Sequence, residues 1–355
     1  MTQINVANRY STFIGIDVDK HSYSFTVKER NIMNRSKKIP ADPKQLYNYI
    51  KNSFGHKKVL CAYEAGGSGF GLYDYLKKKR ISCLVIPPSA IPVARNEKVK
   101  NNRIDSQRIA DYLKADNKIK PIRVPEGSYR ELRHLTKIRE NYVQSRTIAK
   151  QRIKALLLSA NLYSVYKDAD NNWSYSYIEN LKQISCSEAV RLRLNMLLLD
   201  LEYARNQTLA IHRQLKKFCQ DQPEIDKYRS YLQSIPGIGF ISAVSLLARI
   251  GDPSLLKNER ELGAFLGLVP REHSTGDAVN QGSITHLGNQ RLRGLLIEAA
   301  WTAIRIDTQL GKFFERIKSR HHPKIASRKA IVAVARKLTL IIYRILKEQR
   351  NYVRH

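Results

Sequence analysis

Hydrophobic residues in the first third of the chain follow two patterns, short continuous runs and helix-like spacing. The short apolar runs predict β-strands near residues 12–18, 22–28, 58–63 and 82–86. Helix-like spacing predicts helices near residues 41–53, 68–79 and 102–115. A three-residue connection, Asp19-Lys20-His21, predicts that the first two strands form a hairpin. This alternation predicts a mixed sheet flanked by helices, an α/β fold, over residues 11–116.

After Pro121 and Pro125 the pattern changes to that of long helices. Apolar residues recur at spacings of three, four and seven over about 127–160 and again over about 186–220. In the first helix they are Leu132, Leu135, Ile138, Tyr142, Ala149, Ile153 and Leu156, and in the second Leu192, Met196, Leu199, Tyr203, Leu209 and Leu215. Two such helices with a polar, aromatic stretch between them predict either an antiparallel coiled-coil arm or an ordinary helix pair.

The last third of the chain has the pattern of a separate all-α domain. A turn, Ser234-Ile235-Pro236-Gly237-Ile238-Gly239, precedes an apolar helix that reaches Ile250. A glycine-rich stretch follows, and helices are expected over about 289–306 and 326–348. We therefore expect three domains, over residues 1–122, 123–227 and 228–355.

The net charge of the chain indicates which class of molecule it binds. Its 62 Lys plus Arg residues exceed its 31 Asp plus Glu residues, which gives a net charge of +31 spread along the whole sequence. Such an excess favours a polyanion, and nucleic acid is the partner that we expect. No apolar segment reaches the roughly 18 residues of a membrane span, and residues 1–5 lack a signal pattern. The four cysteines are scattered without a CxxC pair, as expected for a cytoplasmic protein.

Acidic residues at the ends of two predicted strands are the first candidates for chemistry. Asp17 and Glu64 each end an apolar run, and Asp105 lies in the first turn of a predicted helix. Strand alternation would place Asp19 on the face of Asp17, and helical spacing would place Asn102 on the face of Asp105. Carboxylates gathered in this way can hold divalent metal beside a phosphodiester. For each residue alone, a turn or a helix-dipole contact is an equally good interpretation.

The C-terminal part offers a phosphate-binding turn and a hydroxyl-bearing loop. The turn at Gly237 and Gly239 resembles the hairpin of helix–hairpin–helix DNA-binding motifs, whose backbone N–H groups bind phosphate. A second glycine-bounded loop carries the hydroxyl groups of Ser274, Thr275 and Ser283. The basic residues that flank it are Arg271, His273, Arg291 and Arg293. A serine there could attack a phosphate whose charge the basic residues stabilise. On spacing alone, helix capping by these hydroxyls is the commoner arrangement.

Four short motifs occur in a fixed order over roughly residues 11–305. They are Gly15-Ile16-Asp17-Val18-Asp19-Lys20, Tyr63-Glu64-Ala65, Lys98-Val99-Lys100-Asn101-Asn102-Arg103-Ile104-Asp105, and Pro236-Gly237-Ile238-Gly239 together with Gly267-Leu268-Val269-Pro270-Arg271-Glu272. In order and spacing they resemble the DEDD-motif insertion-sequence transposases, the Piv-like recombinases guided by a bridge RNA. Each motif is modest alone, and the set is specific.

The resemblance implies a RuvC-like (RNase H-like) N-terminal domain, a coiled-coil linker and a C-terminal transposase domain with a serine nucleophile. It implies Mg²⁺ at Asp17, Glu64 and Asp105, with the fourth family acid replaced here by Asn102. The nucleophile maps to Ser274, and a shift of register would select Thr275 or Ser283 instead. The implied partners are donor and target DNA, an element-encoded guide RNA and further copies of the chain, in a tetramer.

Two other functions remain open at this stage. A metal-dependent junction nuclease would hydrolyse DNA with water and would need no serine. A non-catalytic nucleic-acid-binding protein would explain Asn102, because an amide oxygen can ligate Mg²⁺ but supplies no charge.

Overall fold

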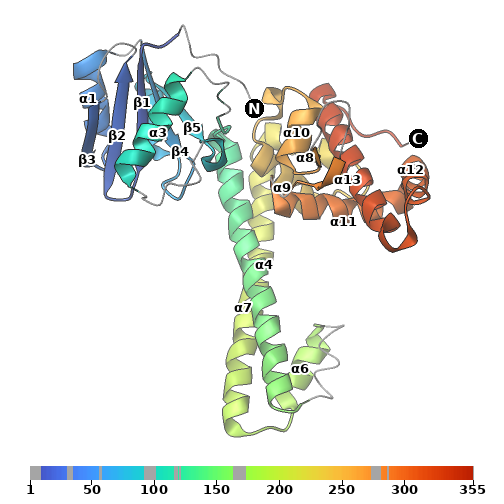
Figure 1. Ribbon diagram of the computed structural model, residues 1–355. Helices are drawn as coiled ribbons and strands as arrows, with labels where there is room; N and C mark the ends of the chain where they lie inside the picture. Colours follow the sequence, from blue (N-terminus) through green and yellow to red (C-terminus); the bar gives the residue numbers. More distant parts are fainter. Residues whose placement is uncertain are drawn as a thin grey trace. The chain divides into compact units, whose positions relative to one another are not determined.

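The computed structural model describes residues 9–29, 35–55, 58–91, 101–115, 119, 121–162, 173–272, 281–285 and 288–354, with the backbone alone for residues 270–272 and 281–283. The chain divides into two compact units, Met1–Val124 and Pro125–His355. Each unit is described by itself below, and both are drawn in Figure 1.

A five-stranded mixed sheet forms the centre of the first unit. Its strands are β1 (Thr12–Val18), β2 (Ser22–Glu29), β3 (Arg35–Pro40), β4 (Val59–Glu64) and β5 (Ser82–Ile86), in the order β3-β2-β1-β4-β5. β1 pairs antiparallel with β2 and parallel with β4, and β4 pairs parallel with β5. The predicted hairpin between β1 and β2 is confirmed. A sheet of this order is consistent with an RNase H-like domain, and the predicted mixed α/β class is confirmed.

Helices cover both faces of this sheet. α1 (Pro43–Phe54) and α2 (Gly71–Lys78) pack on the face that carries Ile14 and Ile16. α3 (Asn102–Lys114) packs on the opposite face, which carries Phe13, Leu60 and Ala62. Because side chains alternate along a strand, the odd-numbered positions of β1 and the even-numbered positions of β4 face α3.

β3 is an element that the hydrophobic pattern did not predict. Its sequence Arg-Ser-Lys-Lys-Ile-Pro is almost wholly exposed, because it pairs with β2 on one side only and forms the edge of the sheet. Edge strands in proteins are commonly polar and basic, which prevents pairing with other chains. Such a strand lacks the apolar run by which the other four were recognised.

Two 33-residue helices, α4 (Gly127–Ser159) and α7 (Glu188–Gln220), lie side by side in the second unit (Figure 1). One end of the pair joins the C-terminal core through Leu132 and Leu215. The other end has its own apolar cluster, which includes Ile153 and Leu198 and is completed by α6 (Tyr175–Gln183). We call α4, α6 and α7 the arm.

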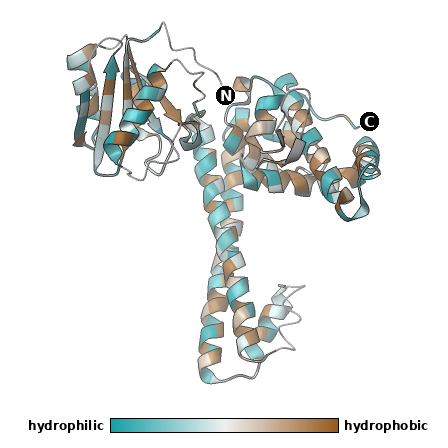
Figure 2. Cartoon of the chain, in the orientation of Figure 1, coloured by the Kyte–Doolittle hydropathy of each residue, from teal (hydrophilic) through white to brown (hydrophobic). Residues whose placement is uncertain are grey.

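The face of α7 that packs in the arm differs from the predicted one. Leu194, Leu197, Leu198 and Leu201 are buried, whereas five of the six residues predicted to form the packed stripe are exposed. The exposed residues are Leu192, Met196, Leu199, Tyr203 and Leu209. The prediction was wrong because α7 is apolar on two faces, and the pattern alone does not say which one meets α4. Figure 2 shows apolar positions interspersed with polar ones along both helices.

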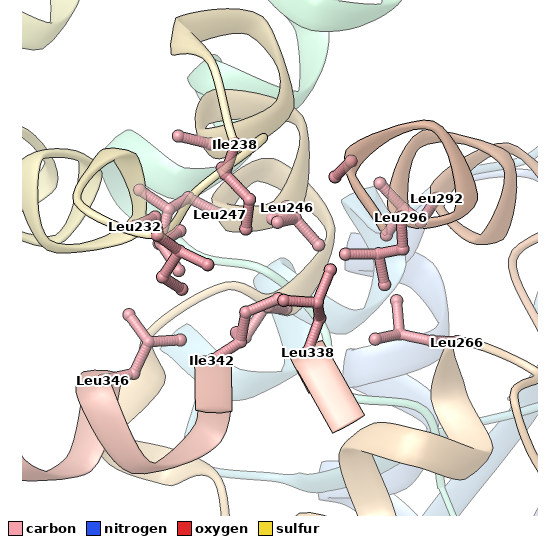
Figure 3. Close-up of a cluster of buried hydrophobic side chains, with 14 of the residues drawn as sticks. Leu232, Ile238, Leu246, Leu247, Leu266, Leu292, Leu296, Leu338, Ile342 and Leu346 are labelled. Atoms are coloured by element: carbon pink, nitrogen blue, oxygen red, sulfur yellow. The ribbon is translucent and has the colours of Figure 1, made fainter. Parts of the chain in front are cut away.

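Helices of 7 to 26 residues and one small hairpin build the rest of the second unit. They are α8 (Pro223–Gln233), α9 (Phe240–Ile250), α10 (Glu259–Phe265), β6 (Pro270–Glu272), β7 (Gln281–Ile284), α11 (Gln290–Ile306), α12 (Thr308–Lys318) and α13 (Pro323–Glu348). Figure 3 shows Leu338, Ile342 and Leu346 of α13 in the core with Leu246 and Leu247 of α9. Among the described residues, no helix is both long enough and apolar enough to cross a membrane.

Candidate functional site

Asp17 and Glu64 lie side by side at the ends of two neighbouring parallel strands. Ile16 pairs with Tyr63 in the β1–β4 ladder, so Asp17 and Glu64 follow at the next position of the register. Adjacent strands lie about 5 Å apart. Both residues also lie on the α3 face of the sheet, since Asp17 is two positions after Gly15 and Glu64 is two positions after Ala62.

Gly15 brings α3 directly onto β1. A Cβ atom added at Gly15 would lie 2.2 Å from the carbonyl oxygen of Ser106 and 2.3 Å from the nitrogen of Ala110. The Ser106 hydroxyl also lies 2.9 Å from the hydroxyl of Thr26, the residue that pairs with Gly15 in β2. Glycine is therefore required here, because any side chain would push the helix off the sheet.

The direction of α3 places its first turn toward the acidic strand ends. Its later residue Asp111 forms an ion pair with Lys28, which pairs with Phe13 near the start of β1. Ser106 lies over Gly15, further along the strand. The helix therefore runs antiparallel to β1. Asp105, in its first turn, lies beyond the level of Gly15, toward the end of the strand at which Asp17 lies. The structure brings the three predicted acids to one end of one sheet face.

The first turn of α3 carries the remaining predicted ligands. Asp105 accepts a hydrogen bond from the guanidinium of Arg108 at 2.9 Å and is partly buried. Asn101 caps the helix by accepting from the Arg103 N–H at 3.1 Å, and Asn102 is the exposed first helical residue. Asn102 and Asp105 are three residues apart in one helix and so share a face, as expected.

Asp19 lies one residue beyond the end of β1. β1 ends at Val18, so the alternation of a strand does not extend to Asp19. Its carboxylate accepts from the N–H of Lys20 at 2.7 Å, and its own N–H donates to the carbonyl oxygen of Ser22. Asp19 is thus an exposed residue of the hairpin turn, and a role for it as a further metal ligand stays a prediction.

The donor chemistry of this strand-end site suits a hard divalent cation. Asp17, Glu64 and Asp105 offer carboxylate oxygens and Asn102 an amide oxygen, which are the ligands of Mg²⁺ and Ca²⁺. The side chains are not gathered to ligating distance, because the described residues contain no group of three or more His, Cys, Asp or Glu that could hold a metal ion. The residue types and their placement fit a metal, and binding would require the side chains to turn toward one another.

The loop after Glu64 is held against the end of β1. The Ser68 hydroxyl donates to the carbonyl oxygen of Val18 at 2.9 Å, and the Tyr63 hydroxyl donates to the carbonyl oxygen of Gly69 at 3.1 Å. These bonds fix the path of the Gly66-Gly67 turn beside the acidic strand ends, where both glycines are exposed. The loop therefore leaves the edge of the site open.

The predicted phosphate-binding turn connects α8 with α9. Gly237 has φ +84°, and a Cβ there would lie 2.2 Å from the carbonyl oxygen of Ala299 in α11. Glycine is thus required by the close contact with α11. Gly239 is the exposed N-cap of α9, whose first-turn N–H groups have no partner within the helix. This end of α9 can accept an anion.

Arg291 and Arg293 have different environments at the start of α11. Arg293 is 9% exposed and donates to the carbonyl oxygens of Gly267 and Thr285 at 3.4 Å. These carbonyls flank the β6–β7 hairpin, so Arg293 holds the base of the hairpin, which favours a positioning role over contact with nucleic acid. Arg291 is more exposed and lies 3.3 Å from a carboxylate oxygen of Glu140.

Glu140 is a residue that the sequence did not single out. It is 7% exposed, and it accepts from the Arg249 guanidinium at 3.0 and 3.2 Å as well as facing Arg291. Burial lowers the pKa of the neighbouring Arg133 and Arg139, and nearby arginines lower it further. The contacts of Glu140 with Arg249 and Arg291 join α4, α9 and α11. Glu140 is one of two acids in a basic helix, and its position gave no signal that could have revealed its role.

The hydroxyl candidates belong to the stretch of sequence that begins with β6 and ends with β7. Ser274 and Thr275 lie between the two strands, outside the described residues, and so does His273. Ser283 lies in β7 and Arg271 in β6, where only the backbone is described.

A five-stranded mixed sheet with neighbouring strand-end carboxylates, joined to a basic helical unit, is consistent with a DEDD-type transposase. Two family models match the chain, one described as "Transposase" over residues 14–162 and one as "Transposase IS116/IS110/IS902 family" over residues 229–315. The chain belongs to the IS110 family of insertion-sequence transposases.

Curated relatives agree with this assignment. A putative transposase of Sinorhizobium fredii is 29% identical over 322 residues, covering 86% of this chain and 75% of the relative. The transposase for insertion sequence element IS1111A of Coxiella burnetii is 30% identical over 279 residues, covering 76% and 72%. The pilin gene-inverting protein of Moraxella bovis is 32% identical over 134 residues, covering 37% and 40%. The chain is thus an insertion-sequence transposase with a gene-inverting protein among its relatives.

Proposed function

We propose that the chain is an RNA-guided DNA recombinase that moves its own insertion element with a serine nucleophile and an acidic, Mg²⁺-binding site. The observation that carries this proposal is that Asp17 and Glu64 end neighbouring parallel strands on the sheet face that α3 covers, with Asp105 in the first turn of that helix. The family assignment supports the cutting and rejoining of DNA. The charge of +31 supports tight contact with polyanions.

The proposed chemistry is a phosphoryl transfer to a serine. The hydroxyl oxygen of Ser274 forms a bond to the phosphorus while the bond from phosphorus to one sugar oxygen breaks. The hydroxyl proton leaves, and the departing sugar oxygen takes up a proton. Reversal of this step with a different sugar hydroxyl rejoins the DNA without loss of the phosphodiester bond. Thr275 and Ser283 are the alternative nucleophiles.

The strand-end carboxylates would hold Mg²⁺ next to the reacting phosphate. Bound there, the ion supplies positive charge that stabilises the transition state and the leaving oxygen. Asn102 would contribute an amide oxygen in place of the charged fourth ligand. The chain would therefore bind the ion more weakly than a chain with four acids.

Contacts to the nucleic-acid backbone would come from the second unit. The N-terminus of α9 at Gly239, together with Arg271 and Arg291, supplies N–H donors and positive charge. Gly237 and Arg293 would act by holding the turn and the hairpin in place. An element-encoded RNA would read the donor and target by base pairing, with the protein contacting mainly its backbone and shape.

The exposed stripe of α7 supports assembly with further copies of the chain. Leu192, Met196, Leu199 and Tyr203 recur at spacings of four, three and four and are each about 60% exposed. Contiguous exposed apolar residues of this kind mark interaction surfaces. We propose a homo-oligomer, a tetramer, in which acids of one subunit meet the serine of another. All four cysteines are free, in keeping with the cytoplasmic location that we propose.

Covalent trapping tests the proposal. The purified chain, its RNA and labelled element-end DNA are incubated with Mg²⁺ and separated on a denaturing gel. We expect a covalent protein–DNA species from the native chain and from Thr275→Ala, and none from Ser274→Ala. DNA cutting by Ser274→Ala at the native rate would overturn the serine mechanism.

The two alternatives give different results in the same assay. A junction nuclease would cut without any covalent species and would be indifferent to both hydroxyl substitutions. A non-catalytic binding protein would shift the DNA on a native gel but would cut nothing, even as Asn102→Asp.

A further inference from the structure

A small cavity on the arm is lined by three cations and a tryptophan. Arg146 and Lys150 of α4, Arg205 of α7 and Trp173 surround it, and Ile178 and Leu201 complete the lining. Arg146 and Lys150 are four residues apart and so share a face of α4. The cavity has a volume of about 80 Å³. We call it the arm pocket.

The cations of the arm pocket have no acidic partner among the described residues. None of Arg146, Lys150 and Arg205 takes part in any of the ion pairs found there, although other cations of the arm do, such as Lys182 with Glu179. The pKa of Lys150 is lowered, first by burial and then by the charges of Arg146, Arg205 and Lys154. The charged neighbours that act on this amine are all cations among the described residues, so an anionic ligand in the pocket would relieve their repulsion.

Aromatic rings lie against these cations. The Lys150 Nζ lies 5.1 Å from the centre of the Trp173 ring, and the Arg205 guanidinium lies 4.3 Å from the centre of the Tyr175 ring. Tyr175 is 71% exposed, whereas Trp173 is partly buried and packs edge-on against Tyr177. The exposed tyrosine offers a surface on which a base can stack beside these cations.

The cavity is large enough for a phosphate group and larger than a single water molecule needs. One water occupies about 10–15 Å³ of such a cavity, so the arm pocket admits several oxygen-sized groups at once. Three cations at its wall match the charge of an oxyanion. A cation-lined groove with an adjacent aromatic platform is the arrangement that binds single-stranded nucleic acid.

We propose that the arm pocket binds a backbone phosphate of single-stranded nucleic acid, with the neighbouring base stacked on Tyr175. Arg146, Lys150 and Arg205 contact the phosphate, and Trp173 forms a wall of the site. DNA and RNA share this chemistry, and the test below distinguishes them. The inference deepens the proposed function, because it assigns the arm a role in holding an unpaired strand.

Binding measurements with the full-length chain test the inference. Fluorescence anisotropy is recorded with labelled oligouridine, oligothymidine and a mixed-sequence DNA duplex, over a range of salt concentrations. We expect Lys150→Gln and Arg205→Gln each to weaken single-strand binding about tenfold and to lower the salt slope by about 0.7, the value for one lost phosphate contact. Tyr175→Ala should weaken binding by a similar factor and leave the salt slope unchanged.

Lys137→Gln is the matched control, since Lys137 is an exposed cation of α4 outside the pocket. It should retain native binding to single strands. Equal losses in Lys137→Gln and Lys150→Gln would overturn the inference, as would losses confined to the duplex. A loss for oligouridine alone would assign the pocket to RNA, a loss for oligothymidine alone to DNA, and a loss for both to either strand; each supports a single-strand phosphate site.

Tryptophan fluorescence provides a second readout that does not depend on variants of the pocket. The chain has two tryptophans, so Trp301→Phe leaves Trp173 as the only source of the signal. Oligonucleotide binding should quench or shift it with the dissociation constant seen by anisotropy, and an unchanged spectrum at saturation would contradict the site. These assays measure binding and do not depend on catalysis. The arm-pocket site can therefore be confirmed even if covalent trapping contradicts the proposed recombinase function, and the reverse also holds.

Discussion

Gly15 determines how closely α3 approaches the sheet, and hence where Asp105 lies relative to Asp17. Two backbone atoms of α3 occupy the space that a side chain would take. The sequence predicted the acids from their positions after apolar runs and in a helix turn. It could not predict the contact at Gly15, because that contact depends on the crossing of two elements far apart in the chain.

Gly15→Ala should lower the free energy of unfolding of the first unit by about 3 kcal/mol, as expected for a severe overpacking. It should also reduce DNA cutting, since α3 must move away from the strand ends. Thermal and denaturant unfolding measure the first effect. Gly66→Ala is the control, because nothing lies within 4 Å of a Cβ at that position; equal stability of the two variants would contradict the close contact.

Asn102→Asp should restore the charge that distinguishes this chain from the family pattern. We expect tighter Mg²⁺ binding and faster cutting at limiting Mg²⁺, because a carboxylate binds the ion more strongly than an amide. Isothermal titration and cutting rates over a Mg²⁺ series measure both.

The added charge in the first turn of α3 also stabilises the helix by about 0.3–1 kcal/mol, with or without metal. Unfolding in EDTA therefore separates the two effects. Gln107→Glu, which adds the same charge later in α3, should leave Mg²⁺ binding unchanged. Equal Mg²⁺ affinity of Asn102→Asp and the native chain would remove Asn102 from the site.

At the scale of elements, apolar patterns predicted the buried strands and the long helices, and they missed the exposed β3 and the short helices α6, α8, α10 and α12. The four apolar strands and the long helices were found within a few residues of their observed ends. β3 was missed because it is an exposed edge strand. α6 was missed because its short sequence lies in an aromatic stretch that had been interpreted as a loop, although Ser174 caps it by accepting from the Tyr177 N–H.

The packed face of α7 was the main error at this scale, and it has a consequence for assembly. A helix with two apolar stripes buries one against α4 and presents the other outward. Apolar residues that pack within one chain and apolar residues that pack between two chains recur along a helix at the same spacing. Sequence pattern alone therefore cannot separate them.

Leu199→Lys should weaken self-association if the outward stripe of α7 joins copies of the chain. A lysine in an apolar interface must be desolvated without a partner, which disfavours the assembly. Sedimentation equilibrium should show a lower mass at a given concentration, with unchanged helicity. Asn195→Lys is the control, as an exposed polar position of the same helix. Native masses for both variants would exclude this stripe as the interface.

At the scale of the whole molecule, the candidate residues for catalysis are divided between the two units. The acids lie in Met1–Val124, and the hydroxyl candidates and the basic turn lie in Pro125–His355. Composition alone predicted the polyanionic partner, since the charge is a property of the whole chain. The order of the sequence motifs predicted the family, which the comparisons confirm. Physical reasoning on single segments could not have supplied that assignment.

The central claim is that Asp17 and its neighbours act on the scissile phosphate and are dispensable for holding DNA. Asp17→Asn removes the charge and keeps the size of the side chain. The direct measurement is a pair of assays on one preparation, DNA affinity by anisotropy and strand cutting on a denaturing gel with Mg²⁺ and the guide RNA. The account predicts native affinity with cutting reduced at least a thousandfold, on the order of a lost ligand to a catalytic metal. Cutting by Asp17→Asn at the native rate would contradict it.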